Sequence, residues 1–237
     1  MTAVFAHRGL HARARENTLA AFSGAVALGV DGVELDVRRC SDGELVVHHD
    51  PRIDGRAIAE QTKAELPAYV PSLAAALAAC AGRRVNVEVK NLLDALEASY
   101  DASGDFAREV VRTVEAAGRA NDVIYSSFDL ATCEVLADAG SSPVGWLLDL
   151  DVEPAGAIVR AAAAGLDAIN PYVGVVDAAL VERARDVGLA LNVWTVNARE
   201  DLVAMLALGV DVVITDEPAL AMALRDQGPD GARGAMA

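Results

Sequence analysis

Residues 28–37 read Leu-Gly-Val-Asp-Gly-Val-Glu-Leu-Asp-Val and contain the transition that decides the fold. An Ala/Leu-rich helical stretch ends at Leu28-Gly29, where glycine supplies the left-handed residue that commonly follows a helix. A strand of β-branched and apolar residues begins about two residues later, at Gly32. The same transition recurs at Ala164-Gly165, Val187-Gly188 and Leu208-Gly209. Its recurrence indicates a chain built from repeated βα units.

Short β-branched runs alternate with longer helical stretches almost to the C-terminus. The expected strands are residues 3–6, 32–37, 85–89, 123–125, 144–147, 168–170, 190–194 and 212–215. The expected helices are residues 18–28, 71–81, 104–117, 129–139, 154–164, 177–187, 198–208 and 218–225. Because parallel strands need crossover helices, this pattern predicts an α/β fold, the (β/α)8 TIM barrel. A doubly wound open sheet is the alternative, but Arg8-Gly9-Leu10 lacks the glycine-rich first turn of that fold.

The interval between the second and third expected strands is longer than the others. Ser41-Asp42-Gly43 predicts a turn, residues 44–48 predict an added hairpin strand, and residues 50–69 form a polar insert. We therefore expect one barrel domain over residues 1–226, with a short insertion after the second strand at about residues 50–69. Residues 227–237 are rich in Gly, Pro and Ala, which predicts a disordered tail.

The composition excludes several classes of protein. The 237 residues carry a formal net charge of −15, so nucleic acid and anionic lipid are not expected partners. The longest apolar run, residues 73–81, is too short to span a membrane. The three cysteines are widely spaced and form no ligand pattern, and the first residues show no secretion leader. We expect a cytoplasmic protein with free, mostly buried thiols, and its oligomeric state stays open.

Three carboxylates occupy strand positions that share one face. Glu34 and Asp36 lie two residues apart on the second strand, and Glu88 lies on the third. Carboxylates that face inward near the mouth of a barrel repel one another unless a cation is present. An all-oxygen ligand set suits one divalent cation, Mg²⁺ or Ca²⁺, with Mn²⁺ as a further option.

Histidines and basic residues follow the same strand ends. His7 and Arg8 follow the first strand, His49 ends the added hairpin, and Lys90 follows the third strand. Two histidines can serve as general acid and general base near neutral pH, while arginine and lysine can hold an anionic group. Together with a cation, this set indicates phosphoryl chemistry. Because neighbouring residues alternate faces, we expect His48 to point away from the mouth.

Four other residues have structural interpretations. We expect His11, in a polar loop, to be solvated or to support the site from outside. Asp50 is interpreted as ordering its loop rather than as a base. Asn17 is interpreted as the cap of the first helix, and Glu16 as the partner of an arginine.

Motifs spread in a fixed order along nearly the whole chain carry a family resemblance. They are His7-Arg8-Gly9, Glu16-Asn17-Thr18, Gly29-Val30-Asp31, Glu34-Leu35-Asp36-Val37, Asp42-Gly43, His49-Asp50, Pro71-Ser72-Leu73, Glu88-Val89-Lys90, Ser126-Ser127-Phe128, Trp194-Thr195-Val196-Asn197 and Thr215-Asp216. As an ordered set they resemble the glycerophosphodiester phosphodiesterase family. The resemblance implies a metal-dependent phosphoric diester hydrolase that converts small glycerophosphodiesters to sn-glycerol 3-phosphate and an alcohol.

The resemblance also implies roles for individual residues. These are the acid–base pair His7 and His49, the cation ligands Glu34, Asp36 and Glu88, the phosphate-side groups Arg8 and Lys90, and the cleft-wall residue Trp194. Which histidine is the acid stays open. The insert keeps only the Thr62/Glu65-Leu66 fragment of the family pattern, so the preferred head-group alcohol also stays open.

Three other functions are alternatives. A phospholipase-like barrel acting on a lipid diester calls for an apolar or aromatic rim, and the insert offers only Tyr69. A non-catalytic phosphodiester-binding barrel could lack a histidine or a carboxylate, and none is missing. A metal-dependent aldolase-like barrel needs an enolate-stabilising site and does not call for two histidines beside a phosphate.

Overall fold

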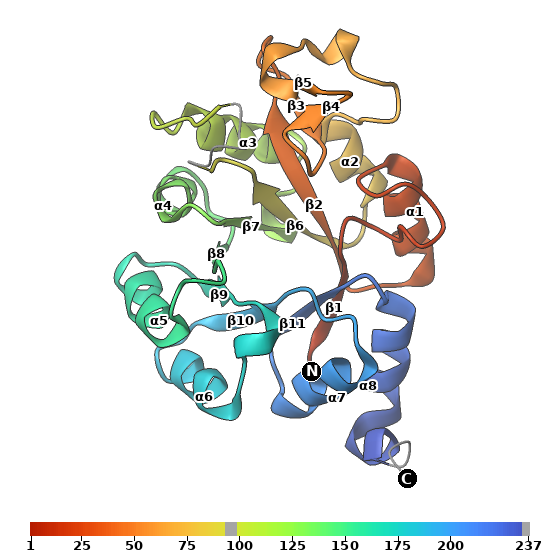
Figure 1. The fold of residues 1–237 in the computed structure, drawn as a ribbon, viewed down its shortest axis with the longest axis vertical. Coiled ribbons are helices and arrows are strands. Elements are labelled where there is room, and N and C mark those ends of the chain that lie inside the picture. Colours follow the sequence, from red (N-terminus) through yellow and green to blue (C-terminus); the bar gives the residue numbers. More distant parts are fainter. Residues whose placement is uncertain (93–98, 234–237) are drawn as a thin grey trace.

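A closed ring of parallel strands forms the centre of the computed structural model, which describes residues 1–92 and 99–233. Within these residues, eight strands follow one another around the barrel (Figure 1): β1 (Ala3–Ala6), β2 (Gly32–Arg39), β6 (Arg84–Val89), β7 (Val123–Ser127), β8 (Val144–Leu147), β9 (Ala168–Asn170), β10 (Ala190–Val193) and β11 (Val212–Thr215). The ring closes because β1 pairs with both β2 and β11. The predicted TIM barrel is confirmed.

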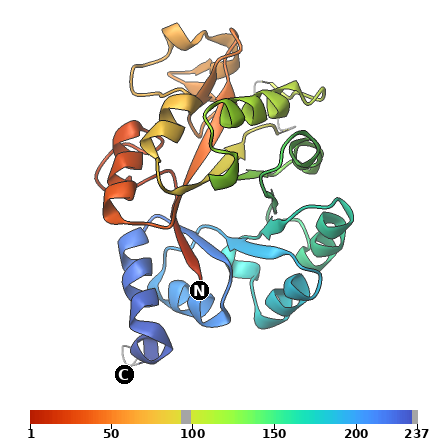
Figure 2. The ribbon, with the colours of Figure 1, turned by 180° about the vertical axis from the view of Figure 1, so that it is seen from behind.

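Helices surround the strands on the outside, as the views from both sides show (Figures 1 and 2). In the described part of the chain they are α1 (Leu19–Leu28), α2 (Leu73–Ala79), α3 (Asp105–Ala116), α4 (Leu130–Ala139), α5 (Pro154–Ala163), α6 (Ala178–Asp186), α7 (Arg199–Leu208) and α8 (Pro218–Arg233). The first transition has the expected chemistry. Thr18 caps α1 by accepting from the Ala21 N–H, and Gly29 ends it with a φ of 90°.

The last helix extends further than the sequence predicts. Residues 227–233, the first part of the expected disordered tail, belong to α8, whose backbone breaks at Gly228 with a φ of 69°. Residues 234–237 lie outside the described residues, and for them the expectation of disorder stays a prediction. None of the helices in the described ranges is long and apolar enough to cross a membrane.

The insertion after β2 forms a small unit at the periphery of the barrel, at the top of Figure 1. It contains β3 (Leu45–Val47), β4 (Arg52–Ile53), β5 (Arg56–Ala57) and the 3₁₀ turns Ile58–Glu60 and Lys63–Glu65. The expected hairpin is present, because β3 pairs antiparallel with β2. Six buried apolar residues hold the unit together: Cys40, Val46, Ile53, Ile58, Leu66 and Val70. Two further 3₁₀ turns, Ala120–Asp122 and Val173–Val175, lie elsewhere in the barrel.

Strand alternation divides β2 between the core and the barrel interior. Val33, Leu35 and Val37 belong to the main apolar core, to which buried residues of the helices also contribute. Glu34 and Asp36 therefore point to the opposite side, into the barrel. The three cysteines are buried free thiols, as expected, and a cytoplasmic location stays a prediction.

Gly32→Ala is expected to destabilise the barrel. Gly32 pairs with Phe5 between β2 and β1, and an added Cβ atom would lie 2.5 Å from the Phe5 ring. Overpacking of this kind lowers the free energy of unfolding, measured in urea, by about 1–3 kcal/mol. The matched control is Gly24→Ala in α1, where the added Cβ atom meets Leu10 at 3.5 Å. This control should be more stable than the parent by about 0.5–1 kcal/mol; equal losses in both variants would contradict the packing.

Candidate active site

The three predicted carboxylates meet inside the barrel. Asp36 on β2 lies directly opposite Glu88 on β6, and each of the three residues offers an oxygen within 4.8 Å of the others. Burial, with the charges of Asp36 and Glu88, raises the pKa of Glu34 well above its ordinary value. The Oε1 atom of Glu34 is buried without a hydrogen-bond partner in the described part of the chain. Close carboxylates and an unpartnered buried oxygen fit a site for a hard divalent cation.

Two cations compensate part of this negative charge. The Lys90 Nζ atom lies 2.7 Å from a Glu88 oxygen and 3.4 Å from Asp36, and the Arg8 Nε atom lies 3.5 Å from Asp36. Burial opposes ionisation of Asp36, but Lys90 and Arg8 outweigh it and hold the pKa of this carboxyl below its usual range. Arg8 also donates its backbone N–H to Glu34 at 2.9 Å and pairs with Glu16 at 3.0 Å. Glu16 is therefore an arginine partner, as interpreted.

Asn17 has a role that the sequence did not indicate. Its side-chain amide donates to Asp36 at 2.7 Å, while Thr18 caps α1. The interpretation of Asn17 as the helix cap is therefore wrong. The backbone φ of Asn17 is 55°, in the left-handed region that asparagine tolerates better than most residues. This turn places the amide where it can fix the orientation of the buried Asp36 carboxylate.

His7 lies between the carboxylates and the last strand. Its Nε2 atom is 3.9 Å from Glu34, and its Nδ1 atom is 2.7 Å from Asp216. His11 reaches the same Asp216 oxygen from the loop after β1, at 2.8 Å. The 2.7 Å and 2.8 Å separations from Asp216 to the two histidines are hydrogen-bond lengths. Asp216 is absent from the predicted site, although it directly follows β11 and so meets the strand-end criterion that selected the other residues.

His49 lies at the end of the added hairpin. Its Nδ1 atom is 2.8 Å from Asp50, and Arg38 donates to its backbone carbonyl. Burial, reinforced by the positive charges of Lys90 and Arg8, lowers the pKa of His49 although Asp36 acts in the opposite direction. The Asp50 side chain therefore contacts this histidine, and its role in ordering the loop stays a prediction.

A pocket of about 110 Å³ connects these groups. Its described lining residues are His7, Arg8, Glu34, His49, Asn86, Glu88, Lys90, Phe128, Leu147, Trp194, Thr195 and Ile214. Every residue of the predicted site except Asp36 lines it, and His48 is not among the lining residues. One side of the pocket is charged, whereas Phe128, Leu147 and Trp194 make the other side apolar.

Comparison with known proteins identifies the family. Residues 7–220 match the model of the Glycerophosphoryl diester phosphodiesterase family. The chain belongs to this family. The predicted resemblance is confirmed, and so is the predicted enzyme class, phosphoric diester hydrolase.

Individual relatives resemble the chain over nearly its full length. A glycerophosphodiester phosphodiesterase of Caldanaerobacter subterraneus subsp. tengcongensis is 30% identical, covering 92% of this chain and 95% of the relative. The crystal structure of a glycerophosphodiester phosphodiesterase from Parabacteroides distasonis is 26% identical with a TM-score of 0.83, covering 95% and 97% of the two chains. An Oleispira antarctica phosphodiesterase, solved in complex with the product sn-glycerol-3-phosphate, is 21% identical with a TM-score of 0.80 and supports the fold; 95% and 97% of the chains are covered.

Glu34→Gln tests whether Glu34, Asp36 and Glu88 form one cation site. Without cation, the substitution should raise the thermal midpoint, because it replaces a buried carboxyl group beside two other carboxylates with a neutral amide. Saturating Mg²⁺ or Ca²⁺ should then stabilise the variant far less than the parent, for which about 2.7 kcal/mol is expected at 100 times the Kd. Glu134→Gln, at an exposed position on α4, is the control and should change neither quantity. Equal stabilisation of the Glu34→Gln variant and the parent by the cation would contradict a cation site that includes Glu34.

Proposed function

We propose that the chain hydrolyses glycerophosphodiesters to sn-glycerol 3-phosphate and an alcohol, with one divalent cation and a pair of histidines. The observation that carries the proposal is the composition of the pocket. His7 and His49 line the same small cavity as two of the carboxylates and as Arg8 and Lys90. Acid–base groups, an oxygen-rich cation site and positive charge are the groups that phosphoryl transfer needs.

Glu34, Asp36 and Glu88 would hold the cation, which is Mg²⁺ or Ca²⁺, with Mn²⁺ also compatible with oxygen ligands. When bound, the cation supplies positive charge that favours ionisation of an attacking hydroxyl and offsets charge on the phosphate. The Lys90 ammonium group contacts Glu88 and Asp36, and Lys90 also lines the pocket.

The two histidines move the protons. His7 accepts the proton of the attacking hydroxyl or water at its Nε2 atom, and His49 donates a proton to the oxygen of the departing alcohol. The bond between phosphorus and that oxygen breaks as the new P–O bond forms, so one proton is taken up and one released. Arg8 and Lys90 offset the charge that develops on the phosphoryl oxygens.

Removal of the cation should abolish the activity. With glycerophosphocholine as substrate, excess chelator should stop the release of choline, and added Mg²⁺, Ca²⁺ or Mn²⁺ should restore it. Full activity in excess chelator would contradict the cation requirement. Binding of glycerophosphocholine without turnover in the presence of each cation would instead favour the non-catalytic binding barrel.

Substitution of single histidines should lower the activity at His7 and His49 but not at the neighbouring His48. His7→Ala and His49→Ala should each lower kcat about 10²- to 10⁴-fold, the usual contribution of a general acid or base. His48→Ala is the matched control, because His48 contacts the Asp50 carbonyl and does not line the pocket. Its kcat should stay close to that of the parent. A loss in His48→Ala as large as that in His49→Ala would overturn the assignment.

A lipid diester is a second candidate substrate, because the pocket has an aromatic rim. The ring of Trp194 lies 5.4 Å from Phe128 and 5.9 Å from Tyr172. Tyr172, which follows β9, is 39% exposed. This rim could not be predicted from the insert, because its aromatic residues follow strands that lie far apart in the chain.

Hydrolysis of a lysophospholipid distinguishes the two substrates. If the rim holds an acyl chain, 1-acyl-lysophosphatidylcholine should be cleaved at least as efficiently as glycerophosphocholine, and Tyr172→Ser should lower kcat/KM for the lysolipid alone. The effect expected from one apolar contact is about tenfold. Val187→Ser, an exposed apolar residue after α6, is the control. A parent enzyme that cleaves only glycerophosphocholine would exclude the lipid substrate.

A further inference from the structure

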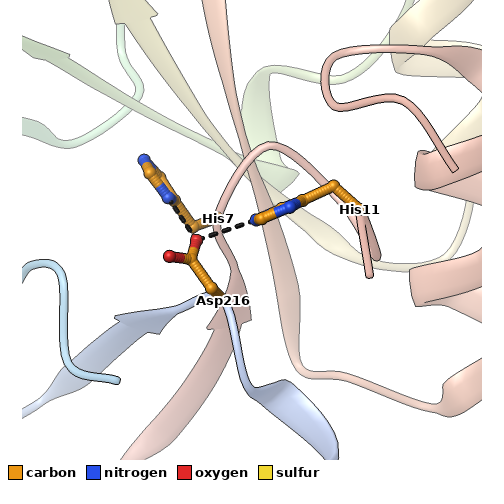
Figure 3. Close-up of side chains that lie close together, drawn as sticks. All are labelled: His7, His11 and Asp216. Carbon is orange, nitrogen blue, oxygen red and sulfur yellow. Dashed lines mark hydrogen bonds and ion pairs between the residues drawn. The ribbon is translucent and has the colours of Figure 1, made fainter. Parts of the chain in front are cut away.

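His7 is held by hydrogen bonds that connect the segments after the first and the last strand of the barrel (Figure 3). We propose that Asp216, supported by His11 and Asn197, is a positioning residue that fixes His7 with its Nδ1 atom protonated and its Nε2 atom free toward the pocket. The inference rests on the proposed function for its catalytic meaning, whereas the state of the ring can be measured independently.

The Asp216 carboxylate is constrained at both oxygens. Oδ1 lies 2.7 Å from the His7 Nδ1 atom and 2.8 Å from the His11 Nε2 atom. Oδ2 accepts from the Asn197 amide at 2.6 Å, and the Asp216 backbone N–H donates to the Asn197 Oδ1 atom at 2.9 Å. Rotation of the carboxylate would break several of these contacts together. Asp216 therefore offers His7 an acceptor in one fixed direction.

An ionised carboxylate accepts hydrogen bonds and donates none, so the protons in these contacts belong to the histidines. Burial works against ionisation of Asp216, but hydrogen bonds from His7 and His11 hold its pKa below the ordinary value. The His7 Nδ1 atom must therefore carry a proton. In a neutral imidazole the lone pair is then on Nε2, the nitrogen that faces Glu34 at 3.9 Å.

His11 is the second histidine of this network, in the supporting position that was one of its two expected roles. It belongs to the loop after β1, and its ring meets that of His7 edge to face with centroids 6.4 Å apart. Its Nε2–H donates to the same Asp216 oxygen that His7 contacts, so the two rings converge on one oxygen, as Figure 3 shows. Without His11, this oxygen would keep His7 as its one side-chain donor among the described residues, and Asp216 would be less firmly held.

The second histidine of the pocket has a much looser support. His49 contacts Asp50, its neighbour in sequence, whose side chain is 72% exposed. The corresponding exposure of Asp216 is 29%. His7 is thus oriented before substrate arrives, which suits a proton acceptor that must face the attacking hydroxyl, whereas His49 can turn with the leaving group. The geometry points to His7 as the base.

Nitrogen-15 NMR of the histidine rings in the full chain tests the orientation directly. With four histidines, the spectrum is simple, and the His7 signals are identified by their loss in His7→Ala. In the neutral form, His7 of the parent should show a protonated Nδ1 and an unprotonated Nε2 atom. Asp216→Ala should change this ring to the opposite tautomer or a mixture. A parent His7 protonated at Nε2 would overturn the proposal, whatever the activity.

Kinetics of matched variants tests the supporting role of His11. His11→Ala should lower kcat about tenfold, the effect of losing one hydrogen bond to a charged group, with little change in KM. His11→Gln should restore most of this loss, because its side-chain amide can still donate to Asp216. His48→Ala should change neither constant. Unchanged kcat in His11→Ala, or equal losses in His11→Ala and His11→Gln, would overturn the supporting role.

Discussion

Glu34, Asp36 and Glu88 bring negative charge into a part of the barrel that water barely reaches, and the surrounding contacts compensate for it. Lys90 and Arg8 pair with these carboxylates, and Asn17 orients Asp36. The compensation is incomplete, since Glu34 keeps an unpartnered oxygen. A charge left without a partner costs free energy in an apolar interior. A bound cation would lower this cost by compensating the remaining negative charge of the carboxylates.

The charged and apolar sides of the pocket come from different halves of the chain. The carboxylates, His49 and both cations belong to β1, β2, β6 or the segments that follow β1, β3 and β6. The apolar residues Phe128, Leu147 and Trp194 follow or end β7, β8 and β10. The first half can therefore supply the chemistry, while the second half shapes the space around the substrate. Variation in the loops after β7 and β8 would change the apolar side of the pocket without altering Asn197 and Asp216, which contact each other, or the contact of Asp216 with His7.

Local patterns predicted most of the fold, and the reasons are visible in single elements. β1, β8, β9 and β11 begin and end where the β-branched runs do. β2 runs on to Arg39, two residues past its predicted end, because the strand of the expected hairpin, β3, pairs with Val37, Arg38 and Arg39. Spacing of two residues placed Glu34 and Asp36 on one face. Contacts of His11 and Asn17 could not be predicted, because they depend on how loops fold back onto strands that are distant in sequence.

The position of Asp216 has a consequence for how the site is assembled. Asp216 and His7 are 209 residues apart, and they meet because β11 pairs with β1 when the ring closes. Glu34, Asp36 and Glu88 lie on β2 and β6, whereas Asp216 follows the last strand of the barrel. The contact between Asp216 and His7 therefore depends on closure of the ring, whereas the grouping of the three carboxylates involves no residue of β11.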